Sequence, residues 1–363
     1  MQLSIILPTH RHDLTALARI AQACSWARPT IEVIVRDNSG NAEKRAALKH
    51  LQHDNCTIVS VDECDARENL AGAMRLSKGD FVFVVADDDM CFDQAIAAIP
   101  AILDRIAKDP STVGIAGPYI VEALAGSIVI NYKAIDAADP AARVAGYLTE
   151  TGPNVLYFAV LRRDVLMRVV AFIEGLPILC SYHDQIMSLL YLLNGKYHLL
   201  PRLFYMYDYG LWENPGTAQR LDANFYAEAG LDPGINLLHW FLCAFEGAVL
   251  TLHSDAFPAH PPAQRQAIAN LWFSTMFARF KNSKRLTFGS KFTGEVEQAC
   301  AKLQGMAGSV TFDVMLTEIC AVIGTFSKEK ASDYFDYWDA TLKRRKPPVR
   351  AAAKAEPAEP VMP

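Results

Sequence analysis

The first 110 residues alternate short β-rich runs with segments whose apolar residues recur every three to four positions. Strand-like runs cover 3–7, 31–35, 57–61 and 81–86, and helical spacing covers 13–27, 42–52 and 70–77. Strands that are buried on both faces and separated by helices are typical of a parallel sheet covered by helices on both sides. The pattern therefore predicts an α/β domain at the N-terminus.

The pattern changes twice further along the chain. Strands are expected near 113–116, 127–132, 155–161 and 197–200, with helices around 163–173 and 183–193. Beyond residue 222 the strand pattern fades, and helical patterns cover 235–253, 262–282, 293–305, 310–325 and 329–344. The end of the chain is rich in Pro and Ala, which predicts a disordered tail. The expected organisation is an α/β domain over 1–225, an all-helical region over 226–345 and a tail over 346–363.

Composition narrows the class of protein. Hydrophobic residues make up 51% and charged residues 21% of the 363 residues, as in an ordinary globular chain, and a net charge of −5 argues against nucleic acid as a partner.

The longest apolar stretch, 235–250, is interrupted by His239 and Glu246 and is shorter than the roughly 20 residues of a membrane-spanning helix. The N-terminus lacks the basic stretch of a signal peptide. The eight cysteines form no CxxC pair, which favours buried thiols in a reducing cytoplasm over a zinc site.

Polar residues directly follow three of the predicted strands. Thr9 and His10 follow the first strand, Asp37 follows the second, and the triple acid at 87–89 follows the fourth. Because ligands of such sheets bind beyond the carboxyl ends of the strands, these side chains are expected to converge on one site. Neighbouring carboxylates repel one another, and Mg²⁺ or Mn²⁺ would relieve that repulsion. A solvated acidic turn, or a cap for a helix over 91–102, explains the same acids without a metal.

Two common nucleotide-binding loops are missing. Neither GxGxxG nor GxxxxGK[ST] follows an early strand, which argues against the dinucleotide-binding and P-loop classes. Asp37 is either a turn-forming residue or a carboxylate that accepts hydrogen bonds from a base or a ribose.

Several segments together resemble family-2 glycosyltransferases of the GT-A fold, over roughly residues 1–210. The resemblance rests on SIILPTH at 4–10, IEVIVRDNSG at 31–40, ENLAGA at 68–73, SKGDFVFVVADDD at 77–89, NVLYFAVLRRDVL at 154–166 and HDQIMSLLYLLNGKYHLLP at 183–201. It does not extend to the helical C-terminal third.

The resemblance implies roles for individual residues. The nucleotide site would comprise Thr9, His10, Asp37, Asn69 and Asp87. Asp88 would be the principal ligand of a Mn²⁺ or Mg²⁺ ion, with Asp89 beside it, and Asp184 would be the catalytic base. Asp184 opens a predicted helix, where the helix dipole alone also favours a carboxylate.

Four positions depart from the family pattern. His10 stands where the family has an aromatic residue, Arg11 where it has Asn, and Ala86 where it has the first acid of D-x-D. His183 replaces the Glu or Asp that precedes the base.

The sequence therefore predicts an inverting, metal-dependent glycosyltransferase, with a nucleotide-diphosphate sugar, UDP in the first instance, as donor. The acceptor would be a hydroxyl of a glycan or of a lipid-linked molecule, as in polysaccharide biosynthesis. A nucleotide-sugar-binding or assembly module without catalysis remains an alternative, favoured by Ala86 and by the altered pair His10 and Arg11. A nucleotidyltransferase is a further alternative, but its Gly-rich loop after the first strand is missing.

Three further features are open to two interpretations. Tyr205, Tyr207 and Tyr209 alternate along a strand-like run and either stack on sugar rings or pack across strands. The 210–220 loop is flexible in composition and would close over the donor, bringing Arg220 near phosphate. Basic residues among aromatic ones either contact an anionic membrane from the cytoplasmic side or form the solvated rim of a packed helix; they are Arg265, Arg279, Lys281, Lys284 and Arg285. Homo-oligomerisation is left open.

Overall fold

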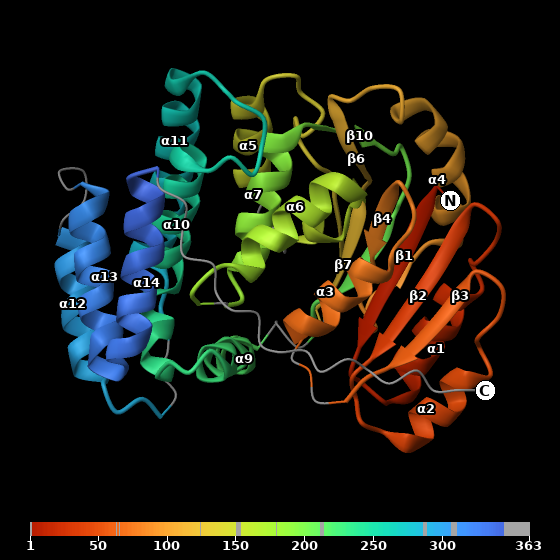
Figure 1. Ribbon diagram of the computed structural model, residues 1–363, viewed down its shortest axis with the longest axis horizontal. Coiled ribbons are helices and arrows are strands. Elements are labelled where there is room, and N and C mark those ends of the chain that lie inside the picture. The colour runs from red at the N-terminus through yellow and green to blue at the C-terminus, as the bar shows by residue number, and fades with distance from the viewer. Residues whose placement is uncertain are drawn as a thin grey trace.

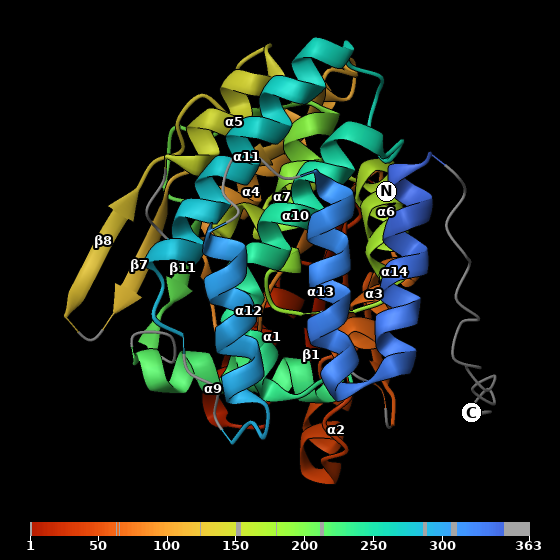
Figure 2. The same ribbon diagram turned by 90° about the vertical axis from the view of Figure 1, so that its left-hand side faces the viewer.

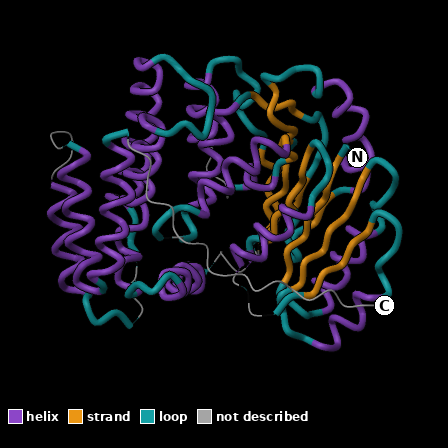
Figure 3. Tube along the Cα trace, in the orientation of Figure 1, coloured by secondary structure: helices purple, strands orange, loops and turns teal. Residues whose placement is uncertain are grey.

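The computed structural model describes residues 2–62, 64, 66–123, 125–149, 154–178, 180–210, 214–285, 289–305 and 311–344. An α/β part lies beside a bundle of helices, and α6 and α7 lie between the two (Figures 1 and 3). The predicted tail at 346–363 lies outside the described residues, as do residues 211–213 of the predicted 210–220 loop.

The main sheet has seven strands in the order β10-β6-β9-β4-β1-β2-β3. Their bounds are β1 Leu3–Thr9, β2 Ile31–Asp37, β3 Cys56–Ser60, β4 Phe81–Val84, β6 Thr112–Ala116, β9 Val160–Arg162 and β10 Lys196–Leu199. β9 runs antiparallel to both of its neighbours, and the remaining pairs are parallel. The predicted α/β class is confirmed, as a mixed sheet.

Helices cover both faces of this sheet because its strand residues are apolar on both sides. Their bounds are α1 Leu14–Cys24, α2 Ala42–Lys49, α3 Ala66–Leu76, α4 Asp93–Ile106, α5 Pro140–Leu148, α6 Arg163–Glu174 and α7 His183–Asn194. Ile5 and Val33 belong to a hydrophobic cluster with residues of α1 and α4. Ile6 and Ile34 belong to another cluster, with residues of α3 and α6, which continues without a break into the C-terminal helices.

A smaller sheet of four strands lies beside the ends of the main strands, in the order β5-β11-β7-β8. It comprises β5 Met90–Cys91, β7 Tyr119–Ala123, β8 Gly126–Ile130 and β11 Tyr205–Asp208. Figure 2 shows the β7–β8 hairpin extending from the body of the molecule. β5 pairs with β11, so the segment that follows the triple acid is fixed to the strand that carries Tyr205.

Two predicted segments differ from the structure. The strand expected over 155–161 is a 3₁₀ helix, η1 Val155–Phe158, followed by β9. The second half of the 210–220 loop is the start of helix α9, Pro215–Glu228. Asn214 caps this helix by accepting a hydrogen bond from the Gly216 N–H at 2.9 Å, and proline is favoured at the first helical position.

The predicted C-terminal helices are confirmed. After α9 come η2 Pro233–Leu238, α10 His239–His253, α11 Pro262–Asn282, α12 Thr293–Gly305, α13 Phe312–Phe326 and α14 Lys328–Leu342. Among the described residues, Pro233–His253 is long and apolar enough to cross a membrane, yet 83% of its most apolar window is buried inside the protein. A buried core helix meets the same criterion, so this is weak support for a membrane span.

Close packing of α10 on α11 depends on Gly247. A methyl group at this position would lie 2.1 Å from Nε1 of Trp272, which donates a hydrogen bond to the Cys243 carbonyl at 2.9 Å. We expect Gly247→Ala to lower the free energy of unfolding by about 1–3 kcal/mol, because the indole must move out of a filled site. Urea denaturation measures this. Gly294→Ala in α12, where nothing lies within 4 Å, is the control and should change stability by less than about 0.5 kcal/mol; equal effects would contradict the packing argument.

Candidate active site

Three of the predicted strand-end residues meet in one buried network. Thr9 and Asp37 are neighbours at the ends of β1 and β2, and the Thr9 hydroxyl donates a hydrogen bond to Oδ2 of Asp87. The Lys44 ammonium lies 2.8 Å from Oδ1 of Asp37 and 2.8 Å from Oγ1 of Thr9. The expected convergence of the strand ends is therefore confirmed. Sequence reasoning missed Lys44, although it lies one helical turn before buried Leu48 on the inner face of α2.

Most of the predicted nucleotide-binding side chains are engaged by the protein itself. Asp37 is fully buried and also accepts hydrogen bonds from the Ser39 N–H and hydroxyl, both at 3.1 Å. Asn69 is 3% exposed; it accepts from Nη1 of Arg36 at 2.9 Å and donates to Oδ1 of Asn38 at 3.0 Å. His10, in contrast, is exposed. Direct contact of Asp37 or Asn69 with a ligand would require these bonds to rearrange, so their nucleotide-binding role stays a prediction.

The three consecutive acids have different surroundings. Asp89 is 3% exposed and accepts hydrogen bonds from the Tyr205 hydroxyl at 2.7 Å and the Asp208 N–H at 2.8 Å. Burial, reinforced by the charge of Asp88, raises the pKa of Asp89 to about 7. Asp88 is partly exposed and forms an ion pair with Nη1 of Arg11 at 3.1 Å. Burial and the neighbouring Asp87 raise the pKa of Asp88, while Arg11 acts in the opposite direction.

The acids at 87–89 could bind a divalent cation only if a substrate supplied further ligands. Within the described residues, no three His, Cys, Asp or Glu side chains are grouped as a metal site. Asp88 is the one acid of the three whose side chain is substantially exposed, at 32%. Mg²⁺ and Mn²⁺ commonly bind through one or two carboxylates and complete their shells with phosphates and water. Asp88 suits such an anchor, whereas Asp89 would have to release Tyr205 or the Asp208 N–H to contact the ion.

Asp184 lies in the first turn of α7, in surroundings that make it basic. Its Oδ1 accepts a hydrogen bond from the Gln185 N–H at 2.5 Å, and the residue is half-buried. Burial raises the pKa of Asp184 to about 7, against the opposing effects of Asn154 and of the Gln185 N–H. The charge of Asp222 raises this pKa further. A carboxyl group with a pKa near 7 is suited to accept a proton at neutral pH.

The pKa of the Tyr207 hydroxyl responds both to Asp184 and to the acids at 88–89. Burial raises the pKa of the Tyr207 hydroxyl, and the charges of Asp89, Asp184 and Asp88 add to the effect. All three carboxylates therefore act electrostatically on one tyrosine of β11. Tyr205, on the same face of that strand, is fully buried and stacks on Phe158, with ring centroids 5.2 Å apart. Of the predicted aromatic row, Tyr205 is part of the core and Tyr207 borders the candidate site.

The basic residues singled out from the sequence divide into two groups. Arg265 donates to the Leu252 and Ser254 carbonyls, and Arg279 and Arg285 stack on the Trp240 ring. Lys281 and Lys284 are exposed, as is Arg220 on α9. Membrane contact through this region therefore stays a prediction, supported by two exposed lysines.

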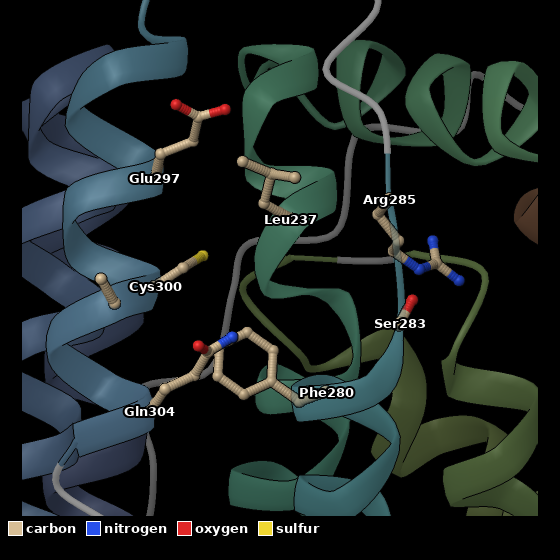
Figure 4. Close-up of a pocket in the computed structure, with 8 residues that line it drawn as sticks. Leu237, Phe280, Ser283, Arg285, Glu297, Cys300 and Gln304 are labelled. Carbon is tan, nitrogen blue, oxygen red and sulfur yellow. The ribbon is translucent and has the colours of Figure 1, made fainter.

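A pocket of about 180 Å³ lies elsewhere, between η2, the end of α11 and α12. Figure 4 shows Cys300 and Gln304 of α12 projecting toward Leu237 and Phe280. It contains none of the site residues predicted from the sequence.

Comparison with known proteins assigns the N-terminal part of the chain to a family. Residues 4–169 match the family model of Glycosyl transferase family 2, a range that contains the acids at 87–89 but not Asp184. No curated protein matches the chain significantly.

Solved structures resemble the chain over most of its length. S. aureus TarS 1–349 has a TM-score of 0.51 at 15% identity, covering 95% of this chain and 88% of that one. The same TarS fragment in complex with UDP-GlcNAc has a TM-score of 0.47 at 13% identity, covering 95% and 88%. The mannosyltransferase PcManGT from Pyrobaculum calidifontis, in complex with GDP-Man and Mn²⁺, has a TM-score of 0.42 at 13% identity, covering 94% and 87%.

The family match fits the α/β part, and the TarS fold matches both this part and the helices that follow it. The chain is therefore an enzyme that contains a family-2 glycosyltransferase domain, matched over residues 4–169, with the GT-A fold extended by a helical C-terminal region.

Proposed function

We propose that the protein transfers a sugar from a nucleotide-diphosphate donor, UDP in the first instance, to an acceptor hydroxyl with inversion, in a metal-dependent reaction. The observation that carries the proposal is that the charges of Asp184, whose pKa is about 7, and of partly exposed Asp88 both raise the pKa of the Tyr207 hydroxyl. A candidate base and a candidate metal ligand thus act electrostatically on the same aromatic side chain.

The donor side of the site is Asp88 together with Arg11. Asp88 would hold Mn²⁺ or Mg²⁺, and a bound cation of this kind stabilises the negative charge of a departing diphosphate. Arg11, now paired with Asp88 and Asp13, carries a positive charge beside the same position and would contribute to diphosphate binding. Tyr205 and the Asp208 N–H hold Asp89, which keeps the acidic segment in place.

The acceptor side is Asp184. Its carboxylate would accept the proton of the acceptor hydroxyl as that oxygen attacks the anomeric carbon. A base that activates the incoming oxygen on the side opposite the leaving diphosphate gives a single displacement, and a single displacement inverts the anomeric centre. The acceptor class, a glycan or a lipid-linked molecule, follows from the family resemblance and is part of the proposal.

The proposal places the enzyme in the cytoplasm. The eight cysteines are free thiols, as expected for a chain in a reducing compartment. Peripheral contact with the inner face of a membrane remains part of the proposal, supported by exposed Lys281 and Lys284.

Asp184→Asn should abolish sugar transfer, lowering kcat by at least about a hundredfold, because an amide cannot accept the proton. The affinity for the donor should change little, since the substitution keeps the size of the side chain. Transfer and hydrolysis of a panel of nucleotide sugars measure kcat, and thermal shift measures donor binding. Turnover retained by Asp184→Asn would overturn its role as base. A wild-type protein that binds donors without turning them over would favour the binding-module alternative.

The pH profile should reflect the Asp184 carboxyl. Because its pKa is raised to about 7, kcat/KM should rise about tenfold per pH unit below that value and level off above it. Asp222→Asn should move the midpoint to lower pH, because the charge of Asp222 raises this pKa. Asp89 also has a pKa of about 7, raised by burial, but Asp222 is not among the charges that act on it. A midpoint unmoved by Asp222→Asn would therefore assign the titration to Asp89 or another group.

Metal dependence can be tested by thermal shift with UDP, GDP, CDP and dTDP, each with and without Mn²⁺. One nucleotide should raise the melting temperature only with Mn²⁺, by an amount that reflects about 2.7 kcal/mol at a hundredfold excess over Kd. Asp88→Ala should lose the shift, and Asp62→Ala, an exposed acid after β3, is the matched control that should keep it. An equal shift without Mn²⁺ would contradict a metal-assisted donor site.

A further inference from the structure

The segment that leads into Asp184 is attached to the helical region by a buried carboxylate. Glu246 of α10 is 1% exposed. Its Oε1 accepts hydrogen bonds from the Tyr182 hydroxyl at 2.9 Å and from the Tyr334 hydroxyl of α14 at 2.8 Å. Its Oε2 lies 3.1 Å from Nε2 of His183. One carboxylate thus contacts both residues that directly precede Asp184.

The contact with Glu246 shows which ring nitrogen of His183 donates to it. A carboxylate oxygen can only accept a hydrogen bond, so Nε2 carries the proton that it donates to Oε2 of Glu246. Nδ1 faces the backbone of Cys180, 2.9 Å from its N–H and 3.0 Å from its carbonyl oxygen. The sequence has His183 where the resembled family has an acid. In the structure this histidine is paired with an acid of α10, Glu246.

A second contact holds the same segment. The Ser181 hydroxyl donates to Oδ1 of Asp222 at 2.5 Å, and Nη1 of Arg285 lies 2.7 Å from Oδ2 of that residue. Three consecutive residues, 181–183, are therefore bound to side chains of α9 and α10.

A buried carboxylate is costly unless donors satisfy it, and Glu246 has three. Those donors come from the start of α7 and from α14, so the carboxylate fixes the first turn of α7 relative to the helical region. Asp184 lies in this turn, where a displacement of 1 Å can reduce a reaction rate by about a hundredfold.

We propose that Glu246 is a positioning residue for the base: it fixes Tyr182 and His183 so that the Asp184 carboxylate is held toward the acceptor. This inference rests on the proposed function, in which Asp184 is the base. It assigns the helical region a part in catalysis, beyond a contribution to folding.

Two tyrosines provide a matched test. Tyr182→Phe and Tyr334→Phe each remove one buried hydroxyl that donates to the same Glu246 oxygen, but Tyr182 is attached to the Asp184 turn and Tyr334 is not. Tyr182→Phe should lower kcat about tenfold or more and leave the donor KM within about twofold. Tyr334→Phe should keep kcat within about twofold although its melting temperature falls by a similar amount. Equal kcat values for the two variants would overturn the inference.

Glu246→Gln provides an independent variant if Tyr182→Phe does not fold. The amide oxygen still accepts hydrogen bonds from both tyrosines. The amide nitrogen, however, faces the protonated Nε2 of His183, and two donors cannot form a hydrogen bond. The variant therefore loses the hydrogen bond to His183, the residue before Asp184. Its kcat should fall as for Tyr182→Phe, and an unchanged kcat would overturn the inference. An inactive Asp184→Asn beside fully active Tyr182→Phe and Glu246→Gln would refute the positioning role alone. An active Asp184→Asn would refute both the base and its positioning.

Discussion

Parallel strands bring acidic side chains together at one end of the sheet, and the structure depends on the neutralisation of their negative charge. Asp37 ends β2 and Asp87 follows β4, the two strands that flank β1, and both residues are almost completely buried. The Lys44 ammonium reaches Asp37 directly and Asp87 through the Thr9 hydroxyl. An unpaired buried charge costs several kcal/mol, so one lysine on α2 allows β1, β2 and the loop after β4 to end at a common point. The edge on which the donor is proposed to bind is built on this network.

Asp88, Asp89 and Asp184 are all aspartates, and what distinguishes them is their burial and the groups that they contact. Asp89 is buried and saturated by Tyr205 and a backbone N–H, which suits a structural role. Asp88 is partly open and paired with Arg11, whose guanidinium can exchange its partner for a phosphate. Asp184 is half-buried beside Tyr207, and burial raises its pKa into the neutral range. Burial of this kind costs stability, and a functional site is where such a cost is expected.

The helical region is continuous with the catalytic part. One hydrophobic cluster extends from Ile6 and Ile34 of the sheet, through α7, to Trp338 of α14. Glu246 lies at the point where α7 meets α10, so a polar contact is embedded in this apolar packing. The packing supplies stability, and the polar contact sets the orientation of the turn that carries Asp184.

The sequence by itself determined the β-α alternation, the positions of α11 and α12, and the residues at the strand ends, because periodicity and turn residues are local properties. It wrongly predicted a strand over 155–161 and a loop over 210–220, where the structure has a 3₁₀ helix at 155–158 and the start of α9, because a short apolar run and a Pro-Gly segment each fit two local structures. Only the tertiary structure showed that Lys44 neutralises Asp37, that the charges of Asp88 and Asp184 both raise the pKa of Tyr207, and that Glu246 pairs with His183. These partners are 7 to 119 positions apart in the chain, and no local pattern records which buried charges will meet once the strands and helices have packed.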